Sequence, residues 1–115
     1  MMCPVVRRTL LTALVLVLPG CGPGLKPDFE AGFARQREAA IVEEVRKGDA
    51  ADLRAIVRML DASEPSTRML AIDGLERLTG TNLGYDPFGP KAEREVAIER
   101  WRVRVAENVD GGVQP

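Results

Sequence analysis

The chain has 115 residues, with 16 basic and 17 acidic side chains, a net charge of −1 and 45% hydrophobic residues. This length and composition fit a single globular domain and exclude a chain that is disordered throughout. A nucleic-acid-binding protein would need a basic excess on one face, which this charge balance argues against. Histidine is absent, so Ser-His-Asp catalysis and zinc sites that need imidazole are excluded.

The N-terminus has the layout of an export signal. The basic pair Arg7 and Arg8 precedes an apolar run from Thr9 to Leu18. That run is far shorter than the roughly 20 residues that a permanent transmembrane helix needs. We therefore predict that residues 1–20 are a signal peptide that is removed, which changes the net charge from −1 to −3. One cysteine, Cys21, then remains, and it cannot form a disulfide within the chain.

The end of this segment, Leu18-Pro19-Gly20-Cys21, resembles the lipobox of bacterial lipoproteins. The resemblance implies a diacylglycerol on the Cys21 sulfur, anchorage to a membrane, and a place in the cell envelope facing the periplasm or the outer surface. Gly22, rather than aspartate, after the cysteine implies the outer membrane. Residues 21–27 would form the lipidated cysteine and a tether. Two alternatives remain: an ordinary signal peptide that leaves Cys21 as a free thiol, or an uncleaved anchor.

Helical signals begin at Asp28, which we predict caps a helix that ends at Lys47 before Gly48. The apolar residues that this helix offers for burial are Phe29, Phe33, Ile41, Val42 and Val45. Asp49 is predicted to cap a second helix. Its apolar residues Leu53, Ile56, Val57 and Leu60 follow the i, i+3, i+4, i+7 spacing of one helical face.

A turn from Asp61 to Glu64 separates this helix from a third, which Pro65 opens and Gly80 ends. The third helix carries the apolar residues Met69, Leu70, Ile72, Leu75 and Leu78. Gly74 within it costs about 1 kcal/mol relative to alanine, and a close helix crossing is the usual compensation. We therefore predict such a crossing at Gly74.

A loop from Gly80 to Pro90 leads to a last helix, predicted from about Pro90 to Ala106. This helix is expected to bury some of the residues Val96, Ala97, Trp101 and Val105. Residues 108–115 have no periodicity and are predicted to be a disordered tail. No segment alternates as a β-strand does, so the sequence predicts an all-α domain of about four helices over residues 28–107.

A shift of ~30 residues aligns residues 39–45 with residues 69–75, which is a weak internal repeat. The segment from Asp49 to Gly80 resembles a HEAT repeat. This resemblance implies antiparallel helix pairs in a short α-solenoid that presents a surface for protein contact. Solenoids generally need about three repeats, whereas four helices supply two pairs. The long first and last helices could act as caps, the helices could form a plain four-helix packing, or the domain could complete its core against a partner.

Within the Gly80 to Pro90 loop, Asn82, Tyr85 and Asp86 are candidates for contact with a partner. In the alternative interpretation Tyr85 and Phe88 tuck under the loop and Asp86 forms an Asx-turn. Trp101 is interpreted as a core residue. The sequence predicts no catalytic residue, no cofactor and no metal site.

Together these features predict a lipid-anchored protein that binds an envelope protein partner as a scaffold or interaction module, and that is not an enzyme. The alternatives are a carrier of a small ligand and a structural lipoprotein with no specific partner.

Overall fold

A computed structural model describes residues 25–48 and 53–111, and this part of the chain is helical, without strands. The predicted all-α fold of four helices is therefore confirmed. Its elements are α1 (Ala34–Lys47), α2 (Leu53–Arg58) with the short 3₁₀ helix η2 (Met59–Asp61), α3 (Pro65–Thr79) and α4 (Lys91–Gly111). Among these described helices, none has the length and apolar character needed to cross a membrane.

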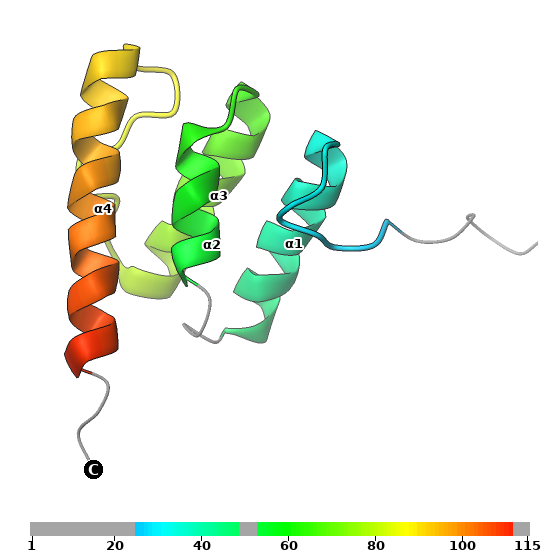
Figure 1. Cartoon of the computed structure of the whole chain (residues 1–115), viewed down its shortest axis with the longest axis horizontal. Helices are drawn as coiled ribbons and strands as arrows, with labels where there is room; N and C mark the ends of the chain where they lie inside the picture. Colours follow the sequence, from blue (N-terminus) through cyan, green and yellow to red (C-terminus); the bar gives the residue numbers. More distant parts are fainter. Residues whose placement is uncertain (1–24, 49–52, 112–115) are drawn as a thin grey trace, which may run out of the picture.

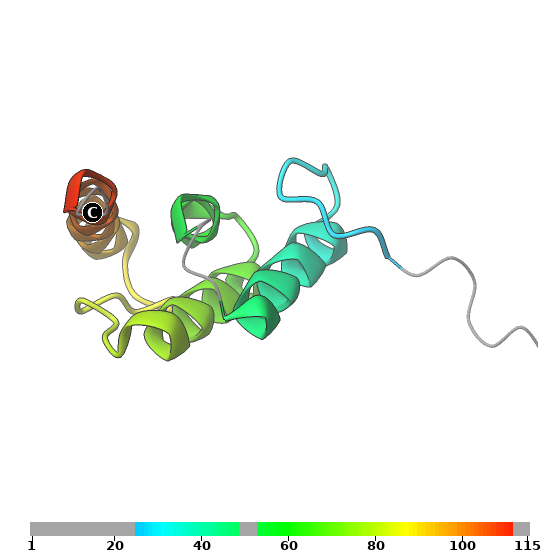
Figure 2. The same cartoon turned by 90° about the horizontal axis from the view of Figure 1, so that it is seen from below.

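The helices form two layers. Helix α1 packs on α3, and α2 packs on both α3 and α4. Figures 1 and 2 show α1 and α3 side by side in one layer, with α2 and α4 in the other. Helix α4 lies at one end of the molecule and α1 near the other. The core therefore lies between the layers, and the end helices are each covered on one side.

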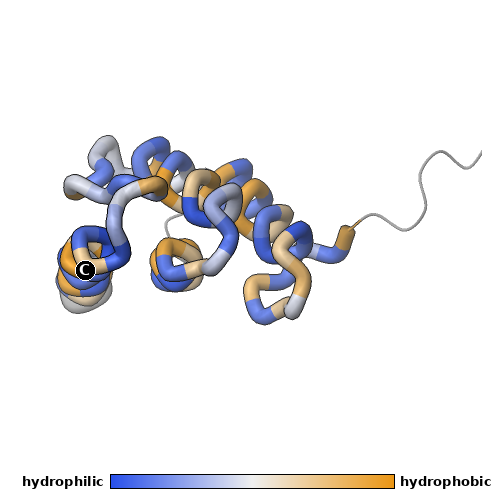
Figure 3. Tube along the Cα trace, turned by 90° about the horizontal axis from the view of Figure 1, so that it is seen from above, coloured by the Kyte–Doolittle hydropathy of each residue, from blue (hydrophilic) through white to orange (hydrophobic). Residues whose placement is uncertain are grey.

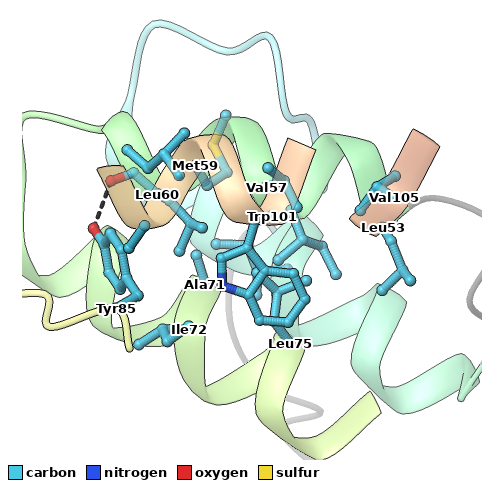
Figure 4. Packing of buried hydrophobic residues seen from close by; sticks show 14 residues of the cluster. Leu53, Val57, Met59, Leu60, Ala71, Ile72, Leu75, Tyr85, Trp101 and Val105 are labelled. Atoms are coloured by element: carbon cyan, nitrogen blue, oxygen red, sulfur yellow. Dashed lines mark hydrogen bonds between the residues drawn. The ribbon is translucent and has the colours of Figure 1, made fainter. Parts of the chain in front are cut away.

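The core centres on Trp101 of α4, which is fully buried among residues of α2 and α3 (Figure 4). Its indole N–H donates to the Asn82 carbonyl at 3.1 Å, so its polar atom is satisfied. The predicted apolar face of α2 is confirmed, because all of its four residues are buried: Leu53, Ile56, Val57 and Leu60. Periodicity alone located this part of the core.

The start of α1 was predicted wrongly. The helix begins at Ala34, and its N-cap is Phe33, with no side-chain hydrogen bond to the cap. Asp28 instead accepts the Glu30 N–H on its Oδ1 at 2.9 Å, and its own N–H donates to the Gln36 carbonyl at 3.1 Å. Residues 28–33 thus turn back along α1, because the Asp28 side chain stabilises a local turn instead of a helix start.

Two of the apolar residues that this region offers for burial remain exposed. Phe33 is 76% exposed and Val42 is 54% exposed, whereas Ile41 is buried. The cause is the layered arrangement: α1 packs against one helix, α3, and Val42 lies at the edge of that contact, where it lines the groove between the two helices. In α4, likewise, Ala97, Trp101 and Val105 are buried but Val96 is exposed.

The glycines predicted to end helices do so. Gly48 ends α1 with φ 63°, and Gly80 ends α3 with φ 81°, both in the left-handed region. Pro65 opens α3 as predicted. The predicted cap Asp49 lies outside the described residues. Helix α4 continues to Gly111, so the prediction of disorder is wrong for residues 108–111, while residues 112–115 lie outside the described part.

The predicted close crossing at Gly74 is confirmed. A Cβ atom placed on Gly74 would lie 2.8 Å from Cγ2 of Val45 and 3.5 Å from Cγ2 of Ile41. The first distance is far below van der Waals contact, and Val45 is a stiff β-branched side chain on α1. Glycine at this position therefore allows α1 and α3 to approach each other.

Candidate interaction surface

Tyr85 ties the loop between α3 and α4 to the core. The side chain is 4% exposed, and its hydroxyl donates to the Leu60 carbonyl at 2.5 Å (Figure 4). Leu60 lies in η2, at the end of a helical segment where carbonyls lack partners within the helix. Burial raises the pKa of the Tyr85 phenol. Tyr85 is therefore a structural residue under the loop, as the alternative interpretation had it, and is not on the surface.

Arg68 holds the same loop from the other side, and sequence reasoning missed it. It is 7% exposed. Its Nε donates to the Pro87 carbonyl at 3.0 Å, and its Nη1 donates to the carbonyls of Ala62 and Ser63 at 2.9 and 2.8 Å. One guanidinium thus joins the turn before α3 to the loop after it. Arg68 shares the buried helical face of Ala71, Ile72 and Leu75, because these residues follow it at i+3, i+4 and i+7. This spacing in the sequence could have indicated that Arg68 is buried.

Asn82 and Asp86 are exposed, but both shape the loop. The Asn82 Oδ1 accepts the Gly84 N–H at 2.9 Å, and the Asp86 Oδ1 accepts the Phe88 N–H at 2.9 Å. The predicted Asx-turn at Asp86 is confirmed. Phe88 is 70% exposed, so the expectation that it tucks under the loop is wrong. Contact of Asn82 and Asp86 with a partner stays a prediction.

The outer side of α4 carries an exposed stripe that we call the α4 seam. Its members follow one another at alternating steps of four and three residues, and all are exposed: Ala92, Val96, Glu99, Val103 and Ala106. Val96 is 55% and Val103 50% exposed, on the side of the helix opposite the buried Trp101. Figure 3 looks along α4 and shows hydrophobic as well as hydrophilic positions around it. Apolar residues are therefore not confined to its buried side.

Two grooves run between helices of the same layer. The groove between α1 and α3 is lined by aliphatic residues that include Val42, Val45 and Leu70. Arg77 also lines it, and its Nε lies 2.9 Å from Oδ2 of Asp73. The groove between α2 and α4 is lined by Arg54, Val57, Arg58, Arg102, Val105 and Ala106. Both grooves are lined by aliphatic and charged side chains.

No metal site is evident in residues 25–48 and 53–111, where no three acidic or cysteine side chains converge. Cys21 lies outside these residues. Comparison with protein-family models, curated proteins and solved structures found no match to this chain.

Proposed function

We propose that this protein is a bacterial lipoprotein that anchors a helical protein-binding module to a membrane of the cell envelope. The anchor is the lipid on Cys21, and its support is the export signal together with the lipobox Leu18-Pro19-Gly20-Cys21. Gly22 favours the outer membrane. Two or three acyl chains would make the attachment effectively permanent, whereas a single chain binds only marginally.

The module is proposed to be a short HEAT-like solenoid of antiparallel helix pairs. In support, the two segments related by the ~30-residue shift fall in α1 and α3. These helices lie side by side in one layer, as equivalent helices of successive repeats do (Figure 2).

The observation that carries the binding function is the α4 seam. A terminal helix of a layered helical protein generally has a polar outer face, which keeps it soluble. Here Val96 and Val103 are half exposed on that face of α4, about two helical turns apart. Apolar side chains at such a position gain free energy when another helix covers them. We infer that a protein partner does so.

The anchor is tested with the full chain expressed in a Gram-negative host. Wild type should be recovered in the membrane fraction with a diacylglycerol on Cys21, detected by mass spectrometry of its N-terminal peptide. Cys21→Ser should be soluble or remain an uncleaved precursor, and Cys3→Ser should behave as wild type. Gly22→Asp should move the protein from the outer to the inner membrane. An unmodified Cys21 in the wild type would contradict the proposal.

The binding function is tested by affinity purification from detergent-solubilised membranes, with mass spectrometry of the recovered proteins. Wild type is compared with Val103→Asp and with the control Met69→Asp, which places the same charge at a site of similar exposure on α3. A partner that is lost with Val103→Asp and kept with Met69→Asp supports the proposal. Equal recovery with both variants would contradict it, and a bound small molecule would favour the ligand carrier.

A further inference from the structure

We infer that the N-terminal segment, residues 25–33, lies on the lipid bilayer and inserts the side chains of Leu25 and Phe33 into its interface. This inference rests on the proposed function in one respect, namely that Cys21 carries the lipid. It does not depend on the α4 seam or on a protein partner.

The length of chain between the lipid and the N-terminal segment is the first argument. Leu25 follows Cys21 by four residues. A chain spans at most ~3.6 Å per residue, so the Cα atom of Leu25 lies no more than about 14 Å from that of Cys21. An acylated cysteine lies at the membrane surface, where the headgroup region is about 5–8 Å thick. Leu25 is therefore confined to the neighbourhood of the lipid headgroups.

Hydrogen bonds and packing fix the N-terminal segment on the first turns of α1. The Asp28 N–H donates to the Gln36 carbonyl at 3.1 Å, and Nη1 of Arg37 donates to the Ala31 carbonyl at 2.7 Å. Between these bonds, Phe29 packs against the core. Figure 1 shows the segment beside α1, at the end of the molecule opposite α4. Because the segment is attached to the helix in this way, the short tether keeps the start of α1 near the membrane as well.

The apolar side chains at this end are the second argument. Phe33 is 76% exposed and Leu25 is 56% exposed. Phe33 is the N-cap of α1, about 5 Å along the helix axis from Gln36. Aromatic and leucine side chains are those with which peripheral proteins enter the boundary between headgroups and acyl chains. Burial of a phenylalanine side chain favours the inserted state over the free state by about tenfold or more.

The charges at this end decide what kind of membrane contact forms. Two residues are basic, Lys26 and Arg35, and two are acidic, Asp28 and Glu30. Oε1 of Glu30 lies 2.9 Å from Nη2 of Arg58, so this carboxylate has a cationic partner. Because the basic and acidic side chains balance, attraction to anionic lipid is not what holds this end on the membrane. The contact is apolar, and a zwitterionic lipid should support it.

Covalent attachment is the reason to choose the bilayer as the occupant. A tether of a few residues holds the N-terminal segment and the lipid surface together at a high effective concentration. A contact that would be marginal for an untethered protein is therefore populated here. With the α1 end on the bilayer, α4 at the other end faces away from it (Figure 1). The insertion thus sets the orientation of the domain, which the lipid alone leaves free.

Quenching of tryptophan fluorescence by brominated lipid tests the insertion. The full chain is expressed in a Gram-negative host and reconstituted into phosphatidylcholine vesicles that contain brominated acyl chains. Phe33→Trp adds a second tryptophan to the buried Trp101, for which the wild type gives the background. The matched control is Phe88→Trp, at a site that is 70% exposed near the start of α4. The added emission of Phe33→Trp should be mostly quenched, and that of Phe88→Trp should not.

The apolar nature of the contact is tested in the Phe33→Trp background. Leu25→Asp should lower the quenching, because it places a charge in the interface, whereas Leu25→Ile should keep it. Added salt should leave the quenching unchanged. Equal quenching of the two tryptophan variants, or loss of quenching in salt, would overturn the inference.

Mass spectrometry of the same samples separates this inference from the proposed function. A lipidated Cys21 without quenching of Phe33→Trp would overturn the inference while the anchor stands. An unmodified Cys21 would refute the anchor, and the inference with it.

Discussion

Replacement of Gly74 by alanine tests how closely α1 and α3 cross. In an exposed helix interior this change stabilises a protein by about 1 kcal/mol, because alanine is the better helix former. Here the new Cβ would lie 2.8 Å from Cγ2 of Val45, so one of the helices must shift. Overpacking of this kind costs about 1–3 kcal/mol. We therefore expect Gly74→Ala to destabilise the protein by about 1 kcal/mol in net terms.

Val45→Ala removes the obstructing methyl group and should reverse the sign of the stability change that Gly74→Ala causes. In that background Gly74→Ala should stabilise the protein by up to about 1 kcal/mol, the helix-propensity term alone. The difference between the two backgrounds is a coupling energy of about 2 kcal/mol. Urea denaturation measures it, with helix content followed by far-UV circular dichroism and the core by the fluorescence of Trp101, the single tryptophan. A stabilising Gly74→Ala in the wild-type background, with no coupling, would refute the close crossing.

Three further predictions concern the residues that hold the loop between α3 and α4. Tyr85→Phe removes the hydrogen bond to the Leu60 carbonyl and should lower the free energy of unfolding by about 1 kcal/mol in urea denaturation. Tyr85 is the single tyrosine, so its ionisation can be followed by ultraviolet absorbance, and its pKa should lie above the ordinary value of 10.0 because the phenol is buried. With the pKa raised in the folded state, the unfolded chain loses its proton first. The contribution of the protonated Tyr85 phenol to the free energy of unfolding is therefore complete below pH 10 and is lost as the pH rises above it. In Tyr85→Phe this part of the loss of stability at alkaline pH should be absent. Arg68→Met leaves the carbonyls of Ala62, Ser63 and Pro87 without this donor and should cost about 2–3 kcal/mol. Amide hydrogen exchange should then become faster in the loop, and an unchanged exchange rate would contradict the role given to Arg68.

Local rules predicted the features of the fold that local chemistry decides. Gly48, Gly80 and Pro65 mark helix ends because each has a backbone preference that does not depend on distant residues. The buried face of α2 followed from helical periodicity. The start of α1 was missed since Asp28 suits both a helix cap and a local turn, and the turn is what forms.

Burial was harder to predict because it depends on which sides of a helix have neighbours. Val96 and Val42 are as apolar as Val57, yet Val96 lies on a side of α4 that no described helix covers, and Val42 lines the open groove between α1 and α3. The α4 seam was missed for this reason, since Val96 was grouped with the core residues of α4. Arg68 shows the converse: an arginine on a buried face is overlooked when polarity alone assigns residues to the surface.

The position of α1 determines how the protein would respond to mechanical load. A protein held by a lipid at its N-terminus receives any pull through residues 22–33, and α1 is the first helix on that path. Helix α1 packs on α3 across the Gly74 crossing, whereas Trp101 and its neighbours join α2, α3 and α4. If the proposed lipid anchor holds the chain, load would therefore reach the contact between α1 and α3 first, where Arg37 pairs with Glu64 at 2.9 Å and Thr67 donates to Glu38 at 3.0 Å. These polar pairs, with Ile41 and Val45 packed against Gly74, are the first contacts that such a pull would strain.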